Sequence, residues 1–137
     1  MKFAYPCTAT PQELSGFFVQ FLDIEEAITQ GDTLEDAAFN AAEVLTDVLA
    51  YRLDKGQAIL PPSDAAGHAV STPSAAVQAV MILREARGGR PIADLARGLD
   101  TSWAAAQRLD DPHHWPSLKQ LDRAARVLGK RLVLNME

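Results

Sequence analysis

The sequence has a single cysteine and no long apolar run. With only Cys7 among 137 residues, a disulfide scaffold and a zinc site built from several cysteines are both excluded. No segment approaches about 18 consecutive apolar residues, so no membrane span is expected. The N-terminus lacks a basic region followed by an apolar run, so no secretion signal is expected either. Together these absences predict a cytoplasmic protein.

Basic residues are scarce in the first half of the chain. Residues 1–65 contain 3 basic and 11 acidic residues, a net charge of −8, whereas residues 66–137 contain 10 basic and 7 acidic residues, a net charge of +3. The whole chain is 47% hydrophobic and 23% charged, which is typical of a globular protein. An acidic half joined to a basic half predicts two modules with different partners, which we place at residues 1–66 and 67–137.

The acidic half combines three short strands with one long helix. Residues 2–8, 16–22 and 27–30 alternate or are enriched in aromatic and β-branched residues, as strands are. Pro6 cannot donate to a strand ladder, which predicts that the first strand is irregular or lies at a sheet edge. A helix follows, capped by Asp32 or Thr33 and ended by Gly56. This order predicts a small antiparallel sheet with a helix across one face.

The basic half is predicted to be mainly helical. Residues 68–71 form a short candidate strand. Helical spacing, caps and terminal glycines then predict helices at residues 73–87, 91–98, 102–109 and 117–128. The last residues, 131–136, alternate again in the strand period. The fold class is therefore α+β, with an N-terminal sheet and a C-terminal helical domain.

Residues 95–109 have the spacing of a helix-turn-helix. The small residue Ala96 lies where the two helices would cross, and a tight turn follows four residues later. In that motif the second helix enters the major groove of DNA. An ordinary helical hairpin in a small helical domain would explain the same spacing, although the basic charge of this half favours DNA.

The candidate DNA-binding side chains lie on or near this helix pair. Arginines and lysines there can bind phosphates, and short polar or aromatic side chains can face a groove. The second helix begins Ser-Trp-Ala-Ala-Ala, which offers few groups that read bases. Each cation could equally lie on a solvated face, and Trp103 could contact a neighbouring subunit. The candidates are Arg97, Ser102, Trp103, Gln107, Arg108 and Lys119.

We predict no catalytic residues, no metal site and no cofactor. Adjacent His113 and His114 have no third ligand at a matching spacing, and Cys7 lies on a predicted buried strand face with no histidine nearby. Residues 23–26 form an acidic turn with Asp23, Glu25 and Glu26 beside a strand end. Catalytic carboxylates normally come from several elements, so this turn is either a solubilising loop or an electrostatic surface for a basic partner.

The residues from 16 to 37 resemble the signature of HicB antitoxins. In that family a strand, an acidic turn, the pattern Thr-x-Gly-Asp-Thr and a helix recur, and here the pattern is Thr29-Gln30-Gly31-Asp32-Thr33. Leu60-Pro61-Pro62-Ser63 is similar to the Pro-Ser segment after that helix. The C-terminal domain of the subgroup with a helix-turn-helix is similar to residues 94–97, 108–109, 113–114 and 128–132.

The resemblance implies a function and a fold. HicB proteins neutralise HicA toxins, which are small basic ribonucleases that cleave mRNA with a histidine. Their N-terminal domain is a partial ribonuclease-H-like sheet without the active carboxylates and covers the toxin; their C-terminal domain dimerises and represses the operon. The chain would then be an antitoxin and not an enzyme. The toxin-binding candidates are Asp23, Glu25, Glu26 and Asp32.

Two other functions compete with the antitoxin. One is a stand-alone transcription regulator whose N-terminal domain senses something else, and the other is a degenerate nuclease that uses the Asp23 cluster. The helix pair also departs from the family, with Ala104 and Ala105 at positions that are commonly polar and Asp100 at the usual turn glycine. These departures bear on DNA affinity more than on toxin binding.

The C-terminal strand is predicted to make a homodimer or a tetramer. An unpaired strand would leave its backbone groups and one apolar face in water. Pairing with the same strand of a second subunit across a two-fold axis satisfies both. The alternative is that the strand folds back onto its own N-terminal sheet. The predicted dimerisation residues are Leu132, Leu134 and Met136.

Overall fold

The chain folds as two compact units. The computed structural model describes residues 2–137 and divides into Met1–Ser74 and Ala75–Glu137. The first unit extends past the predicted boundary at residue 66 because residues 69–71 form a strand of its sheet. Within residues 2–137, no helix combines the length and apolar character needed to cross a membrane.

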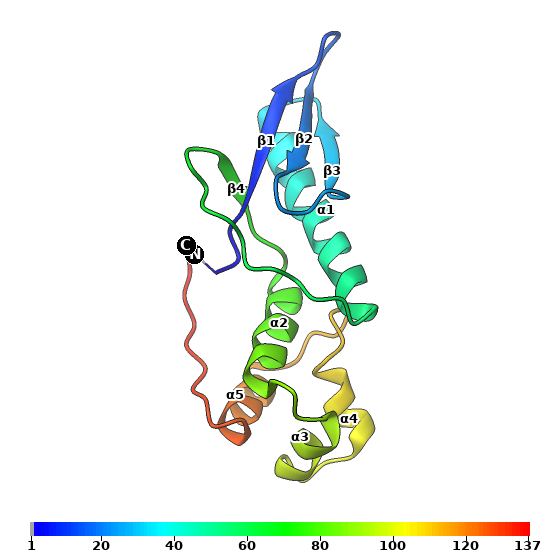
Figure 1. The fold of residues 1–137 in the computed structure, drawn as a ribbon, viewed down its shortest axis with the longest axis vertical. Coiled ribbons are helices and arrows are strands. Elements are labelled where there is room, and N and C mark those ends of the chain that lie inside the picture. Colours follow the sequence, from blue (N-terminus) through cyan, green and yellow to red (C-terminus); the bar gives the residue numbers. More distant parts are fainter. Residues whose placement is uncertain (1) are drawn as a thin grey trace. The chain divides into compact units, whose positions relative to one another are not determined.

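The N-terminal unit is a four-stranded antiparallel sheet with one helix. Its strands are β1 (Tyr5–Pro11), β2 (Phe17–Phe21), β3 (Ile28–Gly31) and β4 (Ala69–Ser71), in the order β3-β2-β1-β4. Figure 1 shows α1 (Leu34–Asp54) lying across one face of the strands. The antiparallel sheet, the helix and the strands predicted at residues 16–22 and 27–30 are confirmed. The first strand, predicted at residues 2–8, runs instead from Tyr5 to Pro11, and its first three residues are all buried rather than alternating.

Of the two alternatives for the first strand, an irregular strand or an edge strand, the edge position is wrong. β1 lies between β2 and β4, so it is an interior strand. Its register with β2 runs from Cys7 opposite Phe21 to Pro11 opposite Phe17, and Pro6 lies opposite Val70 of β4. Just past the end of β2, the Leu22 N–H donates to the Pro6 carbonyl at 3.1 Å. Proline has no N–H to return that bond, so the ladder between β1 and the end of β2 has one hydrogen bond instead of two at this position.

The side of α1 that faces the sheet carries small and branched apolar residues. Ala37, Ala41, Leu45 and Leu49 are each at most 3% exposed. They repeat every four residues, which keeps them on one helical face. The predicted cap Thr33 accepts a hydrogen bond from the backbone N–H of Asp36, so the helix begins where its sequence indicates.

The C-terminal unit contains four helices around its own core. They are α2 (Ala75–Arg87), α3 (Ile92–Gly98), α4 (Trp103–Arg108) and α5 (Leu118–Val127). The core combines residues from all four helices and the loops between them: Leu83, Leu95, Ala96, Leu99, Ala106, Leu109, Ala124 and Leu128. The predicted capping box at Ser117 and Gln120 is present at the start of α5. Helices this short are marginally stable on their own, so packing around the shared core stabilises them.

The α3–α4 pair has a tight turn and close packing. Asp100 in the turn has φ +54°, a left-handed conformation that aspartate tolerates better than most residues. Gly98 at the end of α3 leaves room for Val127 of α5, because a Cβ at this position would collide with the Val127 side chain. The absence of a side chain at Gly98 thus lets the α3–α4 pair pack closely against α5.

The last residues form no strand within the chain. From residue 130 to 137 the part of the chain that the structure describes has no regular secondary structure. Leu134 and Met136 are 66% and 99% exposed, whereas Leu132 is partly buried. The predicted pairing of this segment with a second subunit stays a prediction.

Candidate partner-binding surfaces

Asp23 of the acidic turn binds a segment that is distant in sequence. The Ser63 Oγ donates to Asp23 Oδ1 at 2.8 Å, and the Ser63 backbone N–H donates to Oδ2 at 2.8 Å. The Tyr5 hydroxyl also donates to the Leu60 carbonyl at 3.1 Å. These bonds hold residues 60–63, the Pro-Ser segment singled out in the sequence, against the strand end. Asp23 therefore stabilises the fold of the N-terminal unit by binding Ser63.

Glu26 of the same turn pairs with α1. The Arg52 guanidinium donates to both carboxylate oxygens of Glu26, at 2.9 and 2.6 Å. The hydrogen bonds from Arg52 hold the pKa of Glu26 below its ordinary value, and the pair raises the pKa of Arg52. Glu26 is half exposed, but its charge is compensated by this partner.

Glu25 and Asp32 are the two predicted toxin-binding residues whose carboxylates are uncompensated. Both are exposed, and within residues 2–137 neither has a side-chain partner. Asp32 directly precedes the Thr33 cap of α1. Of the four acidic candidates, the structure thus makes these two available to a partner.

A further acidic surface lies on α1, outside the residues that the sequence pattern singled out. Its exposed residues, which we call the outer α1 face, are Asp36, Phe39, Glu43, Asp47 and Tyr51. Their spacing of three, four, four and four residues puts them on one side of the helix, away from the buried alanines and leucines. The same spacing is visible in the sequence, where it marks the side of the helix opposite the apolar stripe.

Cys7 and Tyr5 are both buried in the N-terminal unit. Burial raises the pKa of the Cys7 thiol, which disfavours the nucleophilic thiolate. Burial also raises the pKa of Tyr5, helped by the negative charge of Asp23 and opposed by Arg52. Cys7 is 6% exposed and its position on a buried strand face, predicted from alternation, is confirmed.

Two of the predicted DNA-binding residues have intramolecular partners. Arg97 pairs with Asp94 one turn earlier at 2.7 Å, with its side chain 74% exposed. The Ser102 hydroxyl accepts from the Ala105 backbone N–H at 3.1 Å and so caps α4. The Ser102 hydroxyl can still donate a hydrogen bond, but the cap fixes its position at the start of α4.

The other four DNA-binding candidates are open to a partner. Trp103 is 59% exposed at the first position of α4 and lies outside the core of this unit. Arg108 and Lys119 are exposed and have no acidic partner in the described part of the chain, and Gln107 is partly exposed. These residues offer charge, an aromatic surface and one amide.

Asp110 neutralises two arginines of α2. Arg84 Nε lies 2.7 Å and Arg87 Nη2 3.3 Å from Asp110 Oδ1, and all three side chains are largely buried. These ion pairs tie the end of α2 to the segment after α4. Part of the basic excess of this half is thus used in folding and is not offered to a partner.

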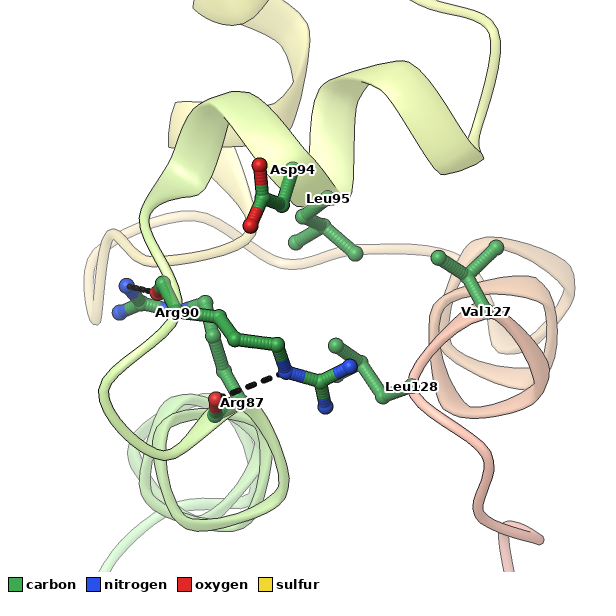
Figure 2. A pocket seen from close by; sticks show the side chains of 6 residues that line it. All are labelled: Arg87, Arg90, Asp94, Leu95, Val127 and Leu128. Carbon is green, nitrogen blue, oxygen red and sulfur yellow. Dashed lines mark hydrogen bonds between the residues drawn. The ribbon is translucent and has the colours of Figure 1, made fainter.

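The shallow pocket in Figure 2 is formed by capping arginines. It is lined by Arg87, Arg90, Asp94, Leu95, Val127 and Leu128 and has a volume of about 40 Å³. Arg90 donates to the carbonyls of Arg87 and Ala86 at 3.1 and 3.0 Å, and Arg87 donates to the carbonyl of Arg90. The Arg90 guanidinium thus satisfies the last carbonyls of α2, whereas Arg87 binds the loop after the helix and Asp110.

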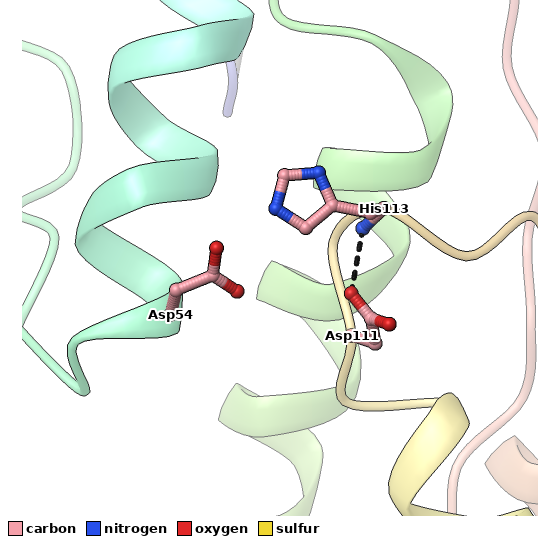
Figure 3. A group of neighbouring side chains, drawn as sticks. All are labelled: Asp54, Asp111 and His113. Carbon is pink, nitrogen blue, oxygen red and sulfur yellow. Dashed lines mark hydrogen bonds between the residues drawn. The ribbon is translucent and has the colours of Figure 1, made fainter.

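Asp111 and His113 organise the loop after α4. The His113 backbone N–H donates to Asp111 Oδ1 at 2.9 Å, as Figure 3 shows. This is the local bond by which an aspartate stabilises a turn. Asp54, the third residue drawn, belongs to the N-terminal unit, so the three side chains define no metal site of one folded unit.

The chain is similar to antitoxins of bacterial toxin-antitoxin systems. A family model described as the HicB-like antitoxin of bacterial toxin-antitoxin systems matches residues 4–80. Antitoxin HicB of Escherichia coli strain K12 is 30% identical over 135 residues, covering 96% of this chain and 98% of that protein. Antitoxin HicB 1 of Photorhabdus laumondii is 28% identical over 134 residues, covering 97% of this chain and 86% of that protein.

The family resemblance inferred from the sequence is confirmed. The family model covers more than half of the chain and includes the whole sheet, α1 and the acidic turn. A second Photorhabdus laumondii protein, antitoxin HicB 2, is 31% identical over 121 residues, or 88% of this chain and 87% of its own length. The similarity to these antitoxins therefore continues through the C-terminal unit, and the chain belongs to the HicB-like antitoxin family.

Proposed function

We propose that this chain binds and neutralises a HicA-like toxin through its N-terminal unit and represses its own operon through its C-terminal unit. The observation that carries the proposal is the charge of the two folded units. All 11 acidic and 3 basic residues of 1–65 lie in the first unit, and the 10 basic and 7 acidic residues of 66–137 lie in the second. An acidic unit suits a basic ribonuclease, and a basic unit suits DNA.

The N-terminal unit would act by binding and not by catalysis. The acidic turn that could have served a nuclease holds the fold instead, since Asp23 binds Ser63 and Glu26 binds Arg52. Glu25 and Asp32 would contribute charge to the toxin interface, with Asp23 and Glu26 shaping it. The toxin would be met in the cytoplasm, where mRNA is cleaved.

The C-terminal unit would bind operator DNA with α3 and α4. The left-handed turn at Asp100, the buried Ala96 and the exposed α4 fit a helix-turn-helix. Trp103 and Gln107 would face the groove, and Arg108 and Lys119 would bind phosphates. Arg97 would reach a phosphate by leaving Asp94, and Ser102 would fix the start of α4.

The homodimer would form through residues 131–136. Leu132, Leu134 and Met136 would share one face of an antiparallel strand pair, which would cover the exposed Leu134 and Met136. The two-fold axis would place two α4 helices about one DNA turn apart. A dimer of such dimers would give a tetramer.

Co-expression with a small open reading frame that lies beside this gene and encodes a HicA-like protein tests the toxin half of the proposal. Induction of that frame alone should stop growth, and the full chain should restore growth and co-purify with its product. A promoter fusion carrying the upstream region tests the other half and should be repressed by the chain. Growth arrest that the chain does not relieve would contradict the antitoxin function for this pair.

A further inference from the structure

Part of the outer α1 face is unfavourable for the isolated fold. Phe39 is 67% and Tyr51 59% exposed, although burying an aromatic side chain is among the largest gains available in folding. Glu43 and Asp47 lie four residues apart on the same side of the helix, a like-charge pair that destabilises helices. The exposed Phe39 and the Glu43–Asp47 pair therefore add nothing to the stability of the helix.

No basic residue within residues 2–137 is paired with the acidic charges of this face. The only arginine of α1, Arg52, is engaged by Glu26 on another side of the helix. Lys55, just past the helix end, lies 5.5 Å from the centre of the Tyr51 ring and covers that ring alone. Asp36, Glu43 and Asp47 are left as an uncompensated acidic row beside Phe39.

We propose that the outer α1 face is a docking surface for a basic surface of the toxin, with Phe39 inserting into an apolar recess between lysines or arginines. This inference rests on the proposed function and names where and how the toxin is held. The acidic row would speed encounter with a basic partner, and the desolvated aromatic would slow dissociation. Two copies of this chain would not pair face to face through this surface, because two such acidic faces repel one another.

Asp47→Lys distinguishes an effect on binding from an effect on folding, because it should raise the melting temperature and lower the association rate constant. The change places a lysine four residues after Glu43, which is the favourable order for a helical ion pair, and it removes a like-charge pair, so the melting temperature should rise. The same change reverses charge on the docking surface. The association rate constant with the HicA-like toxin should be about tenfold lower than that of the unchanged chain at low salt, and this difference should narrow at high salt.

Phe39→Ala tests the aromatic contact independently of charge. The dissociation rate constant should rise about tenfold, with the association rate constant and its salt dependence unchanged. The matched controls are Glu13→Lys and Leu14→Ala in the β1–β2 hairpin, which make a similar change of charge and the loss of an equally exposed apolar side chain. Both controls should bind within about twofold of the unchanged chain.

The measurements use the full chain, the purified toxin-gene product and binding kinetics at several salt concentrations. Binding by the unchanged chain with normal kinetics for both α1 variants would overturn the docking surface and leave the antitoxin function intact. Absence of binding by the unchanged chain would overturn the antitoxin function itself and this surface with it. Loss of self-association in Phe39→Ala, seen by light scattering, would assign the face to a second copy and also overturn the proposal.

Discussion

Arg52 binds both carboxylate oxygens of Glu26, and this pair joins α1 to the acidic turn across 26 positions of sequence. A planar guanidinium facing a carboxylate in this way fixes orientation as well as distance. The pair therefore sets how the turn is presented beside the helix. It also removes the charge of Glu26 from the surface that a partner would meet.

Glu26→Gln should destabilise the protein at neutral pH but not in acid. Arg52 holds the folded pKa of Glu26 below its unfolded value, so the stabilisation is present above the unfolded pKa and is lost as pH falls through the folded pKa. Because the pair is partly exposed, the loss near pH 7 should be only about 0.5 kcal/mol. Urea unfolding at about pH 7 and about pH 3 measures it, with Glu25→Gln as the control. An equal loss at both pH values would contradict this role of the pair.

Ser63→Ala should loosen the segment that crosses the strand end. The change removes the hydroxyl donor to Asp23 but keeps the backbone donor. The free energy of unfolding should fall by about 0.5–1.5 kcal/mol. Hydrogen exchange should show faster exchange of the Ser63 amide, whereas the amides of α1 keep their protection. Unchanged exchange at Ser63 would show that the backbone bond alone is sufficient.

Gly98→Ala should destabilise the C-terminal unit, and a second change should repair it. The added Cβ collides with the Val127 side chain, and such overpacking costs about 1–3 kcal/mol. Val127→Ala in the same chain makes room for the methyl group. Thermal unfolding of both single variants and the double variant gives the coupling energy. Additive losses would show that Gly98 is needed for another reason.

Arg108→Ala should weaken binding to the upstream promoter region and reduce its salt dependence. Loss of one phosphate contact releases one counterion fewer, so the slope of log K against log salt should fall by about 1. Arg97→Ala should have a smaller effect, since Arg97 must first leave Asp94. Gel-shift titrations at several salt concentrations, with circular dichroism as the folding check, measure both. If a chain carrying both Arg97→Ala and Arg108→Ala binds the DNA with full affinity, this helix pair is excluded as the DNA contact.

Deletion of residues 131–137 should yield monomers that no longer bind operator DNA. The removed residues include Leu134 and Met136, whose exposed apolar side chains the dimer would bury. Toxin capture should persist, because the N-terminal unit is unchanged. Light scattering gives the oligomeric state, and pull-down with the toxin-gene product checks capture. A truncated chain that stays dimeric would move the interface to another surface, such as the last helix.

Local sequence determined most of the secondary structure. Thr33 and the Ser117–Gln120 box mark helix starts because a cap bonds only to backbone three residues away. The alternation at residues 17–21 predicts a strand because successive side chains point to opposite faces. The acidic turn and the left-handed Asp100 were also evident from composition and position.

Tertiary structure decided which charges are free to bind and which hold the fold. The sequence shows Asp23, Glu26 and Asp110 only as acidic residues. Folding gives them Ser63, Arg52 and the arginines of α2 as partners. The interior position of β1 was decided in the same way, by pairing with the distant strand β4. Such contacts join distant segments, so no local pattern specifies them, and they leave Glu25, Asp32, the outer α1 face and Arg108 for partners.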